Sequence, residues 1–529
     1  MDAHCLGGLQ LYSVLSGIMI ATILISLDVS IIATAIPAIT SQFNAAADIG
    51  WYGAAYPLTM CALQPLSGKV LTIFSLRLSY LVFFGIFLLG SLLCGASNSS
   101  AMFIIGRAVA GIGGSGIVSG GLSVIALVTP TARRPLFTGL VVSLYGVGTV
   151  IAPIIGGAFT SNVSWRWCFY INLPTGAVTV VALLCFFHPP QSTTIAPQKT
   201  ISQRIMELDL IGCVLFVGSI VMVFLALQWG GSEYTWNSAT IIGLFVGFAV
   251  LILAFIAWQI YRGDAALIPL TLLTDRSILL SIIFAFLFMG SFVVSGYYLP
   301  EWFQIVKDMS PMRSGVMLLP SVCTQVFGAI VSGVTAKHVQ YYNPWFFIGS
   351  SMLCIASGLY TTLRPASTSS KWIGFQILEG LGCGFAAQMP LLTVQNVLKT
   401  RPGLIPVGIS TVLFAQYFGS SVMQAVGASI FHNKLVRGLE SASGAGLSAT
   451  GIAMLLDAGT LNVKQTALQA FPDRVDAIIT AYNDAITTVF YLAVASSALA
   501  FVLSTGIRWT DINRASGGPS EATDKPPEP

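Results

Sequence analysis

The chain has 529 residues, of which 55% are hydrophobic and only 8% are charged, and its mean hydropathy is +0.83. Soluble globular proteins carry about 25% charged residues, so this composition excludes a soluble fold. The net charge of +4 is too small to indicate nucleic-acid binding. The first eleven residues contain no Lys or Arg, so we expect no cleavable signal peptide.

Apolar stretches of about twenty residues, the length of a membrane-spanning helix, recur along the chain between short polar segments. We therefore predict an all-α integral membrane protein with fourteen transmembrane helices, at 14–38, 50–71, 79–96, 101–127, 137–160, 171–188, 209–229, 239–261, 277–300, 313–334, 345–364, 371–393, 404–431 and 485–508. The predicted units are a short N-terminus (1–13), a six-helix bundle (14–188), two linking helices (189–261), a second six-helix bundle (262–508) with an outer loop (432–484), and a polar, disordered tail (509–529).

An even number of spans places both termini on one side of the membrane. The loops on that side carry eleven Lys and Arg residues, against five in the short loops opposite. Because positive charge favours the cytoplasmic side, both termini are predicted to be cytoplasmic. Asn98 and Asn162 begin two N-x-Ser sequons in predicted outward loops, so both are candidate N-glycosylation sites.

Three short matches relate the first and last six spans in the same order. GIGGSG (111–116) matches GLGCG (380–384), TVIAPIIGG (149–157) matches TVLFAQYFG (411–419), and PLSGKV (65–70) matches IVSGVTAK (330–337). An offset of eight spans preserves orientation, so the halves are predicted to be parallel pseudo-repeats. This arrangement is typical of carriers that rock two bundles about a central site.

Three charged residues lie inside predicted spans: Asp28 in the first, Arg107 in the fourth and Glu379 in the twelfth. A charge at the centre of the bilayer costs roughly 2.5–3.5 kcal/mol, so such residues are usually functional and paired. From the rise per residue, Asp28 lies about 15 Å and Arg107 about 9 Å from the outer edge, a difference that an Arg side chain can cover. The alternatives are a proton-coupling pair and a static ion pair. For Glu379 they are a proton or cation site and a structural hydrogen bond.

Several longer motifs resemble the major facilitator superfamily, and within it the fourteen-span drug:proton antiporters of fungi that include mycotoxin efflux pumps. The resemblance is carried by LDVSIIATAIPAI (27–39), GRAVAGIGGSG (106–116), GVGTVIAPIIGG (146–157), WRWCFYINLPTG (165–176), LALQWGG (225–231) and YYLPEWFQIVKDMSPMRSGVMLLP (297–320). It implies proton coupling through Asp28 and Arg107, with the proton gradient as energy source and no cofactor or metal.

The same resemblance assigns two further motifs. Gly146, Gly148, Pro153, Gly156 and Gly157 match the antiporter motif of the fifth span, for which tight helix packing is the alternative to gating. The cytoplasmic loop motif is matched by three residues, Gly68, Lys69 and Arg77. This chain has Thr72 about where the wider superfamily has Asp, so the charge relay attributed to that Asp is not carried over.

Aromatic and amide residues inside the spans are the candidates for a substrate cavity, because sites for bulky organic ligands are mostly apolar with a few polar groups. They are Trp51, Tyr52, Tyr56, Gln228, Gln376, Gln388 and Gln416. The predicted function is proton-coupled export of small hydrophobic compounds, such as a fungal toxin or a drug.

Several alternatives stay open. A vacuolar carrier of basic amino acids or siderophores would share the fold. A membrane enzyme, a channel and a nutrient sensor are less favoured, because the sequence has no clustered catalytic residues and only a short tail. The expected partners are the bilayer, protons and a small molecule, with no nucleic acid and no obligate protein partner. The expected form is a monomer in the cell membrane, with a vacuolar or vesicular membrane as the alternative.

Overall fold

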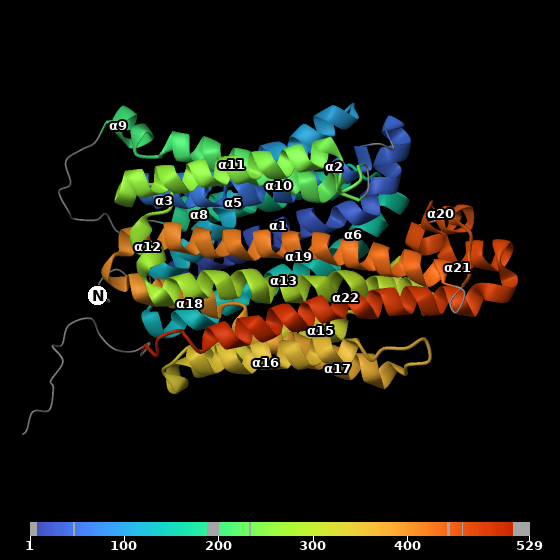
Figure 1. Cartoon of the computed structure of the whole chain (residues 1–529). Helices are drawn as coiled ribbons and strands as arrows, with labels where there is room; N and C mark the ends of the chain where they lie inside the picture. The colour runs from blue at the N-terminus through green and yellow to red at the C-terminus, as the bar shows by residue number, and fades with distance from the viewer. Residues whose placement is uncertain are drawn as a thin grey trace, which may run out of the picture.

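The computed structural model describes residues 8–45, 48–187, 200–231, 234–441, 445–457 and 459–510, and within them the chain is built from helices (Figure 1). Most of the predicted tail, 511–529, lies outside the described residues. The first half contains α1 (Gly8–Phe43), α2 (Ile49–Ala62), α3 (Gln64–Ile73), α4 (Leu76–Gly95), α5 (Ser100–Val128), α6 (Arg134–Asn162), α7 (Trp167–Tyr170) and α8 (Asn172–Phe186).

The middle of the chain forms α9 (Ile201–Met206), α10 (Leu210–Trp229) and α11 (Ala239–Arg262). The second half contains α12 (Leu270–Thr274), α13 (Arg276–Ile305), α14 (Pro311–Val316), α15 (Leu319–Val339), α16 (Asn343–Tyr360), α17 (Ser369–Ala386), α18 (Met389–Val397), α19 (Ile405–Glu440), α20 (Ala449–Asp457), α21 (Gly459–Ala470) and α22 (Val475–Ser504). Within the described residues, short 3₁₀ turns lie between helices at Thr131–Arg133, Gly263–Ala265, Leu398–Thr400, Pro402–Leu404 and Pro472–Arg474.

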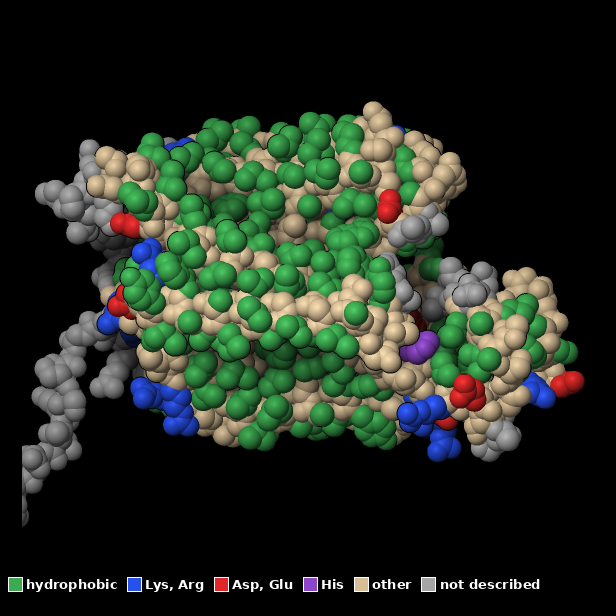
Figure 2. All heavy atoms as spheres, turned by 45° about the horizontal axis from the view of Figure 1, so that its top comes forward, with side chains coloured by type: hydrophobic (Ala, Val, Ile, Leu, Met, Phe, Trp, Pro, Cys, Tyr) green, Lys and Arg blue, Asp and Glu red, His purple; other side chains and the backbone are tan. Residues whose placement is uncertain are grey.

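Twelve helical segments of the described chain are long and apolar enough to cross a membrane. Two predicted spans are not among them. The predicted span 50–71 is divided between α2 and α3, and the span 345–364 corresponds to α16, which has 18 residues. The prediction of an all-helical membrane protein is therefore confirmed, whereas the count of fourteen spans stays a prediction. Hydrophobic side chains cover the middle of the molecule, and the charged side chains gather towards its two ends (Figure 2).

Three predicted spans are each divided into two helices, and each division has a proline beside it. Pro65, Pro320 and Pro390 lie in the first turns of α3, α15 and α18. Proline has no N–H to donate and its ring clashes with the carbonyl four residues earlier, so it fits best in the first turn of a helix and bends or breaks a helix further along. The chain therefore begins a new helix at each of these prolines.

The two halves repeat one packing scheme. In the first half α1 packs against α6 and α8, and α5 packs against α2 and α4. In the second half α13 packs against α19 and α22, and α17 packs against α15 and α16. The halves meet along α6 with α15 and along α3 with α19, while α10 packs beside α11 and α2 (Figure 1).

The predicted outer loop 432–484 is largely helical. Helix α19 continues to Glu440 and α22 begins at Val475, so both helices extend well past the predicted span ends at 431 and 485. Between them, α20 and α21 project beyond one end of the bundle, opposite the end where α9 and α12 lie (Figure 1).

Candidate functional site

The first and fourth predicted spans are joined by a buried ion pair. Arg107 Nη1 on α5 lies 2.6 Å from Asp28 Oδ2 on α1, and both side chains are only 1% exposed. The same Nη1 donates to the backbone carbonyl of Asp28 at 3.1 Å. The structure therefore places together the two residues that the sequence singled out as a pair.

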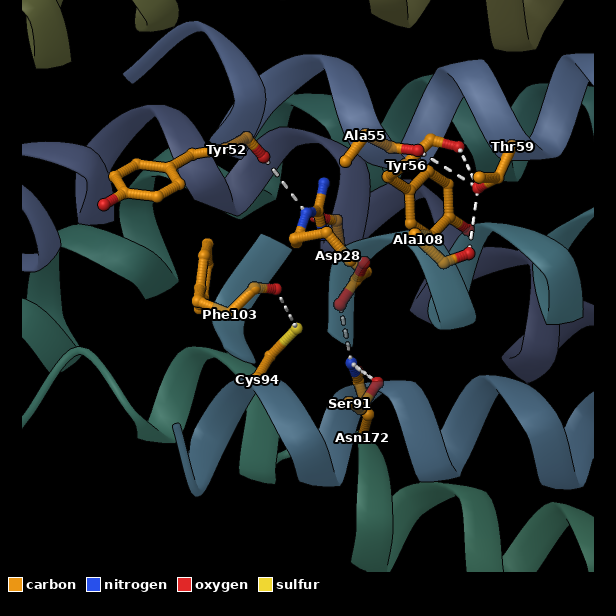
Figure 3. A network of polar contacts seen from close by, with 11 residues as sticks. Asp28, Tyr52, Ala55, Tyr56, Thr59, Ser91, Cys94, Phe103, Ala108 and Asn172 are labelled. Carbon is orange, nitrogen blue, oxygen red and sulfur yellow. Dashed lines mark hydrogen bonds and ion pairs between the residues drawn. The ribbon is translucent and has the colours of Figure 1, made fainter. Parts of the chain in front are cut away.

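Groups from two other helices, α8 and α2, complete this site (Figure 3). Asn172, the first residue of α8, donates from Nδ2 to the second carboxylate oxygen of Asp28 at 3.1 Å. The Nε of Arg107 donates to the backbone carbonyl of Tyr52 at 3.3 Å, and the guanidinium lies 4.8 Å from the centre of the Tyr56 ring. Both charges are thus bonded on more than one side, as a low-dielectric site requires.

Sequence reasoning missed Asn172. Its amide nitrogen also lies 3.1 Å from Ser91 Oγ on α4, so this residue links three helices around the carboxylate. The signal was present in the stretch 165–176, where Asn172 is an amide at the start of a predicted span. The stretch 165–176 was interpreted only as a motif of the family, and no role was assigned to its individual residues.

Two pairs of glycines set the same helix contacts in the two halves. A Cβ on Gly111 of α5 would lie 2.4 Å from the carbonyl oxygen of Tyr56 and 2.2 Å from Thr59 Oγ1. On Gly380 of α17 it would lie 2.1 Å from the carbonyl oxygen of Ser321 and 2.2 Å from Thr324 Oγ1. Each glycine thus admits the backbone of the neighbouring helix, which supports the predicted match of 111–116 with 380–384.

The match of 65–70 with 330–337 is supported in the same way. A Cβ on Gly68 of α3 would lie 2.9 Å from the carbonyl oxygen of Pro406 on α19. One on Gly333 of α15 would lie 3.0 Å from the carbonyl oxygen of Pro135 on α6. Both contacts cross between the halves, so Gly68 is a packing position at their interface.

The third match, of Gly157 with Gly419, is out of register. Gly157 has nothing within 4 Å of its Cβ position, whereas Gly419 faces the carbonyl oxygen of Phe286 at 2.1 Å. The residue of α6 that corresponds in packing is Gly148, which faces Ser26 Oγ of α1 at 2.5 Å. Gly148 and Gly419 each stand thirteen residues after the proline in the first turn of their helix, and this spacing marks the structural register.

The other residues of the fifth-span motif are Gly146, Gly156 and Pro153, and the two glycines lie against neighbouring helices. A Cβ on Gly156 would lie 2.3 Å from Thr34 Oγ1, so this glycine also serves the contact with α1, and on Gly146 it would lie 3.1 Å from Gln325 Oε1 of α15. Pro153 lies inside α6 without ending it. Three of the motif's glycines, Gly146, Gly148 and Gly156, therefore lie at helix contacts, and the gating role of the motif stays a prediction.

Glu379 lies on α17, one turn after Gln376, and is buried. Tyr360 donates to its Oε2 at 2.7 Å and Ser321 donates to the same atom at 3.3 Å. Its Oε1, and both amide atoms of Gln376, are buried without a protein partner. The second half thus holds a carboxyl group bonded to two hydroxyls, one turn after Gln376, the residue that corresponds to Arg107 of the ion pair.

A cavity of about 1330 Å³ opens between the halves at the end of the bundle where α2 begins. It is lined by α1, α2, the end of α10 with the turn after it, α13 and α19. Of the seven residues predicted for the substrate cavity, Gln228 lines it. Its carboxyl group comes from Glu301 on α13, which sequence reasoning missed because the predicted span ended at residue 300.

The other six predicted cavity residues are not among the residues that line this cavity. Trp51 packs edge-on against Trp229, with ring centroids 6.2 Å apart, and Tyr52 and Tyr56 belong to the surroundings of the ion pair. Gln388 donates to Ser332 Oγ at 2.8 Å, which joins α15 to the α17–α18 break, and Gln416 donates to the carbonyl of Ala387 at 3.2 Å. Gln388 and Gln416 are therefore helix contacts in this structure, whereas both amide atoms of Gln376 are buried without a protein partner.

The residues of the predicted cytoplasmic loop motif contact the backbone of other segments. Lys69 lies inside α3, not in a loop, and its Nζ donates to the carbonyls of Ala265 and Ala266 at 3.2 and 2.6 Å. Arg77, in the first turn of α4, donates to the carbonyl of Leu184 near the end of α8 at 2.6 Å. Both tie segments together at the end opposite the cavity.

The two sequons lie at the same end of the molecule. Asn98 and Asn162 are exposed, one between α4 and α5 and one at the last residue of α6. Arg166, just after the second sequon, donates to the carbonyls of Gly95 and Ser97 at 3.2 and 2.9 Å, which brings the two turns together. Within the described residues no group of three His, Cys, Asp or Glu could hold a metal ion.

Comparisons with known proteins agree on one family. A family model described as Major Facilitator Superfamily matches residues 18–424. The MFS-type transporter poxA of Penicillium oxalicum is 45% identical over 514 residues, which are 97% of this chain and 90% of that protein. The efflux pump roqT of Penicillium rubens is 43% identical over 489 residues, which are 92% of this chain and 89% of that protein.

Two solved structures share the fold at 12% identity. The proton:xylose symporter XylE gives a TM-score of 0.60, with 95% of this chain and 96% of that chain covered. The human organic anion transporter MFSD10 gives a TM-score of 0.55, with 92% of this chain and all of that chain covered. At this identity the likeness concerns the fold alone.

Proposed function

The chain belongs to the Major Facilitator Superfamily of membrane transporters, and we propose that it exports small hydrophobic organic compounds in exchange for protons. Two facts support the direction and the cargo. Fungal relatives over 40% identical are named efflux pumps, and the cavity between the halves is lined mainly by apolar and aromatic side chains.

The observation that carries the proposal is the buried pair of Asp28 and Arg107. An ion pair inside the membrane is stable only while its two charges stay together. If α1 and α5 separate, the carboxylate loses its counter-charge and takes up a proton, and their return expels it. This alternation couples a proton to helix movement, with the gradient as the energy source and no cofactor.

The packing between the halves supports alternating access. The two bundles meet along α6 with α15 and α3 with α19, where Gly68 and Gly333 bring backbones into contact. Rocking about such contacts would open the cavity to each side in turn. Glu379 is then a second proton or cation site in the other bundle.

The finer features of this proposal follow from the sequence. They are fourteen spans in a 6+2+6 arrangement, both termini in the cytoplasm, a monomer in the cell membrane, glycosylation at Asn98 or Asn162, and a fungal toxin or drug as cargo. A vacuolar carrier of basic amino acids or siderophores is the alternative within the fold.

The test is mass spectrometry of metabolites inside and outside cells of the source organism that lack the chain or carry variants of it. We expect a compound to accumulate inside the deletion strain, and wild type to restore its export unless a protonophore is added. Asp28→Asn should fail to restore export at equal membrane abundance. Asp308→Asn, which removes an exposed carboxylate, is the matched control and should restore it. Protonophore-sensitive export by Asp28→Asn at the wild-type rate would exclude the coupling role.

A further inference from the structure

Among the residues that the structure describes, the cavity between the halves combines aromatic walls with a single carboxylate. Its aromatic residues are Tyr234, Trp236, Tyr297, Tyr298 and Phe431, and its amides are Gln228, Asn237, Gln424 and Asn433. Glu301 is the only acidic residue among the described residues that line it, and His432 is the only basic one. The cavity volume of about 1330 Å³ exceeds the usual 300–1,000 Å³ of ligand pockets, so a bulky molecule fits.

The carboxyl group of Glu301 is arranged differently from that of Asp28. Asp28 has Arg107 as its counter-charge, whereas Glu301 has a single side-chain hydrogen bond, with Tyr297 one turn earlier on α13. Its Oε2 is buried and has no protein partner. A carboxylate with a buried oxygen and no counter-charge is costly, and a bound cation removes that cost.

Aromatic rings add to the same preference. The face of a Trp or Tyr ring attracts cations. Aromatic rings around one carboxylate therefore form a site that can bind a cation without hydrogen-bond donors. An anion would face Glu301 with no Lys or Arg among the described lining residues. We propose that this cavity binds a lipophilic organic cation, with Glu301 as its counter-charge. As a statement about the transported compound, this inference rests on the proposed export function.

The experiment uses two probes of the same shape and opposite charge, tetraphenylphosphonium and tetraphenylborate. Each is measured by equilibrium dialysis against the full-length protein in lipid nanodiscs, with empty nanodiscs subtracted. Wild type should bind the phosphonium at least tenfold more tightly than the borate. Glu301→Gln should weaken phosphonium binding at least tenfold and leave borate binding unchanged or stronger.

Asp308→Asn is the matched control, because Asp308 lies shortly after α13, pairs with Lys464 and is 63% exposed. It removes the same charge outside the cavity and should change phosphonium affinity less than twofold. If Glu301→Gln does not purify as a folded protein, Gln424→Lys places a positive charge in the cavity and should weaken phosphonium binding at least tenfold.

Equal affinity of wild type for the two probes, or unchanged phosphonium binding in Glu301→Gln, would overturn the inference. Dialysis at equilibrium involves no gradient, so its result is independent of proton coupling. If the protein binds the phosphonium but exports no compound, the cation site is supported and the proposed export function is wrong. If the protein exports a compound but does not prefer the phosphonium, the export function is supported and the cation site is wrong.

Discussion

The two halves of this transporter repeat one contact between helices at a glycine, but the charged residue near that glycine is basic in the first half and acidic in the second. In the first half, α5 meets α2 at Gly111 and carries Arg107 one turn earlier. In the second half, α17 meets α15 at Gly380 and carries Gln376 one turn earlier, with the acid Glu379 beside the glycine. The glycine contact between the helices is therefore the same in both halves, whereas the charged residue near it differs.

The difference lies in what satisfies the buried charge. The first half has an ion pair between α1 and α5, supported by Asn172, so separation of these helices exposes two charges at once. The second half has a carboxyl group bonded to the hydroxyls of Tyr360 and Ser321. We infer that loss of one bonding partner costs more at the ion pair of the first half than at the carboxyl group of the second half.

Arg107→Met should have the largest effect on stability. It leaves Asp28 buried without a counter-charge, and removal of one partner of a buried pair costs about 3–5 kcal/mol. Gln376→Met, at the corresponding position, should be neutral or stabilising, because both amide atoms of Gln376 are buried without a protein partner. Denaturant unfolding of the purified variants measures both. Equal losses in the two variants would show that the halves do not differ in this way.

Ala at either contact glycine should cost about 1–3 kcal/mol, because the added Cβ forces two backbones apart. Gly111→Ala and Gly380→Ala should lower the unfolding free energy by similar amounts, since their nearest atoms are of the same kind. Gly374→Ala on α17 is the control, because nothing lies within 4 Å of its Cβ position. If only one of the two Ala variants loses much unfolding free energy, the two glycine contacts are not structurally equivalent.

Glu379→Ala should cost about 1–3 kcal/mol, because the buried hydroxyls of Tyr360 and Ser321 lose their shared acceptor. Glu379→Gln keeps an oxygen that accepts both bonds and should cost less than about 1 kcal/mol. Thermal unfolding of the two variants distinguishes them. If Glu379→Gln lowers the stability as much as Glu379→Ala does, the negative charge itself stabilises the second half. Both halves would then depend on a buried charge.

The smallest effect is expected at the exposed pair of Lys464 and Asp308, which are 2.9 Å apart with side chains 41% and 63% exposed. Solvent and salt screen such a pair, so Lys464→Ala should change stability by about 0–1 kcal/mol. The same unfolding measurement provides a baseline for the buried sites. A loss comparable to that of Arg107→Met would mean that the α20–α21 region depends on this contact.

The sequence predicted the helices, the buried charges and two of the three repeat matches, because each rests on local information. A charge in an apolar stretch and a glycine at a fixed spacing are visible in one segment. Glu301 and Asn172 were missed because they lie at the ends of predicted spans, where an acid or an amide is ordinary. Only the fold shows that one faces a cavity and the other bonds Asp28.

The third match shows where local information fails. The letters around Gly157 and Gly419 agree, yet the helices are in register at Gly148 and Gly419. Likewise, the predicted cavity amides Gln388 and Gln416 bond to neighbouring helices. Composition alone determined that this chain folds in a membrane, because apolar surface must be kept from water wherever it lies. Which polar groups pair and which face the cavity depends on how distant helices pack, and only the tertiary structure decided that.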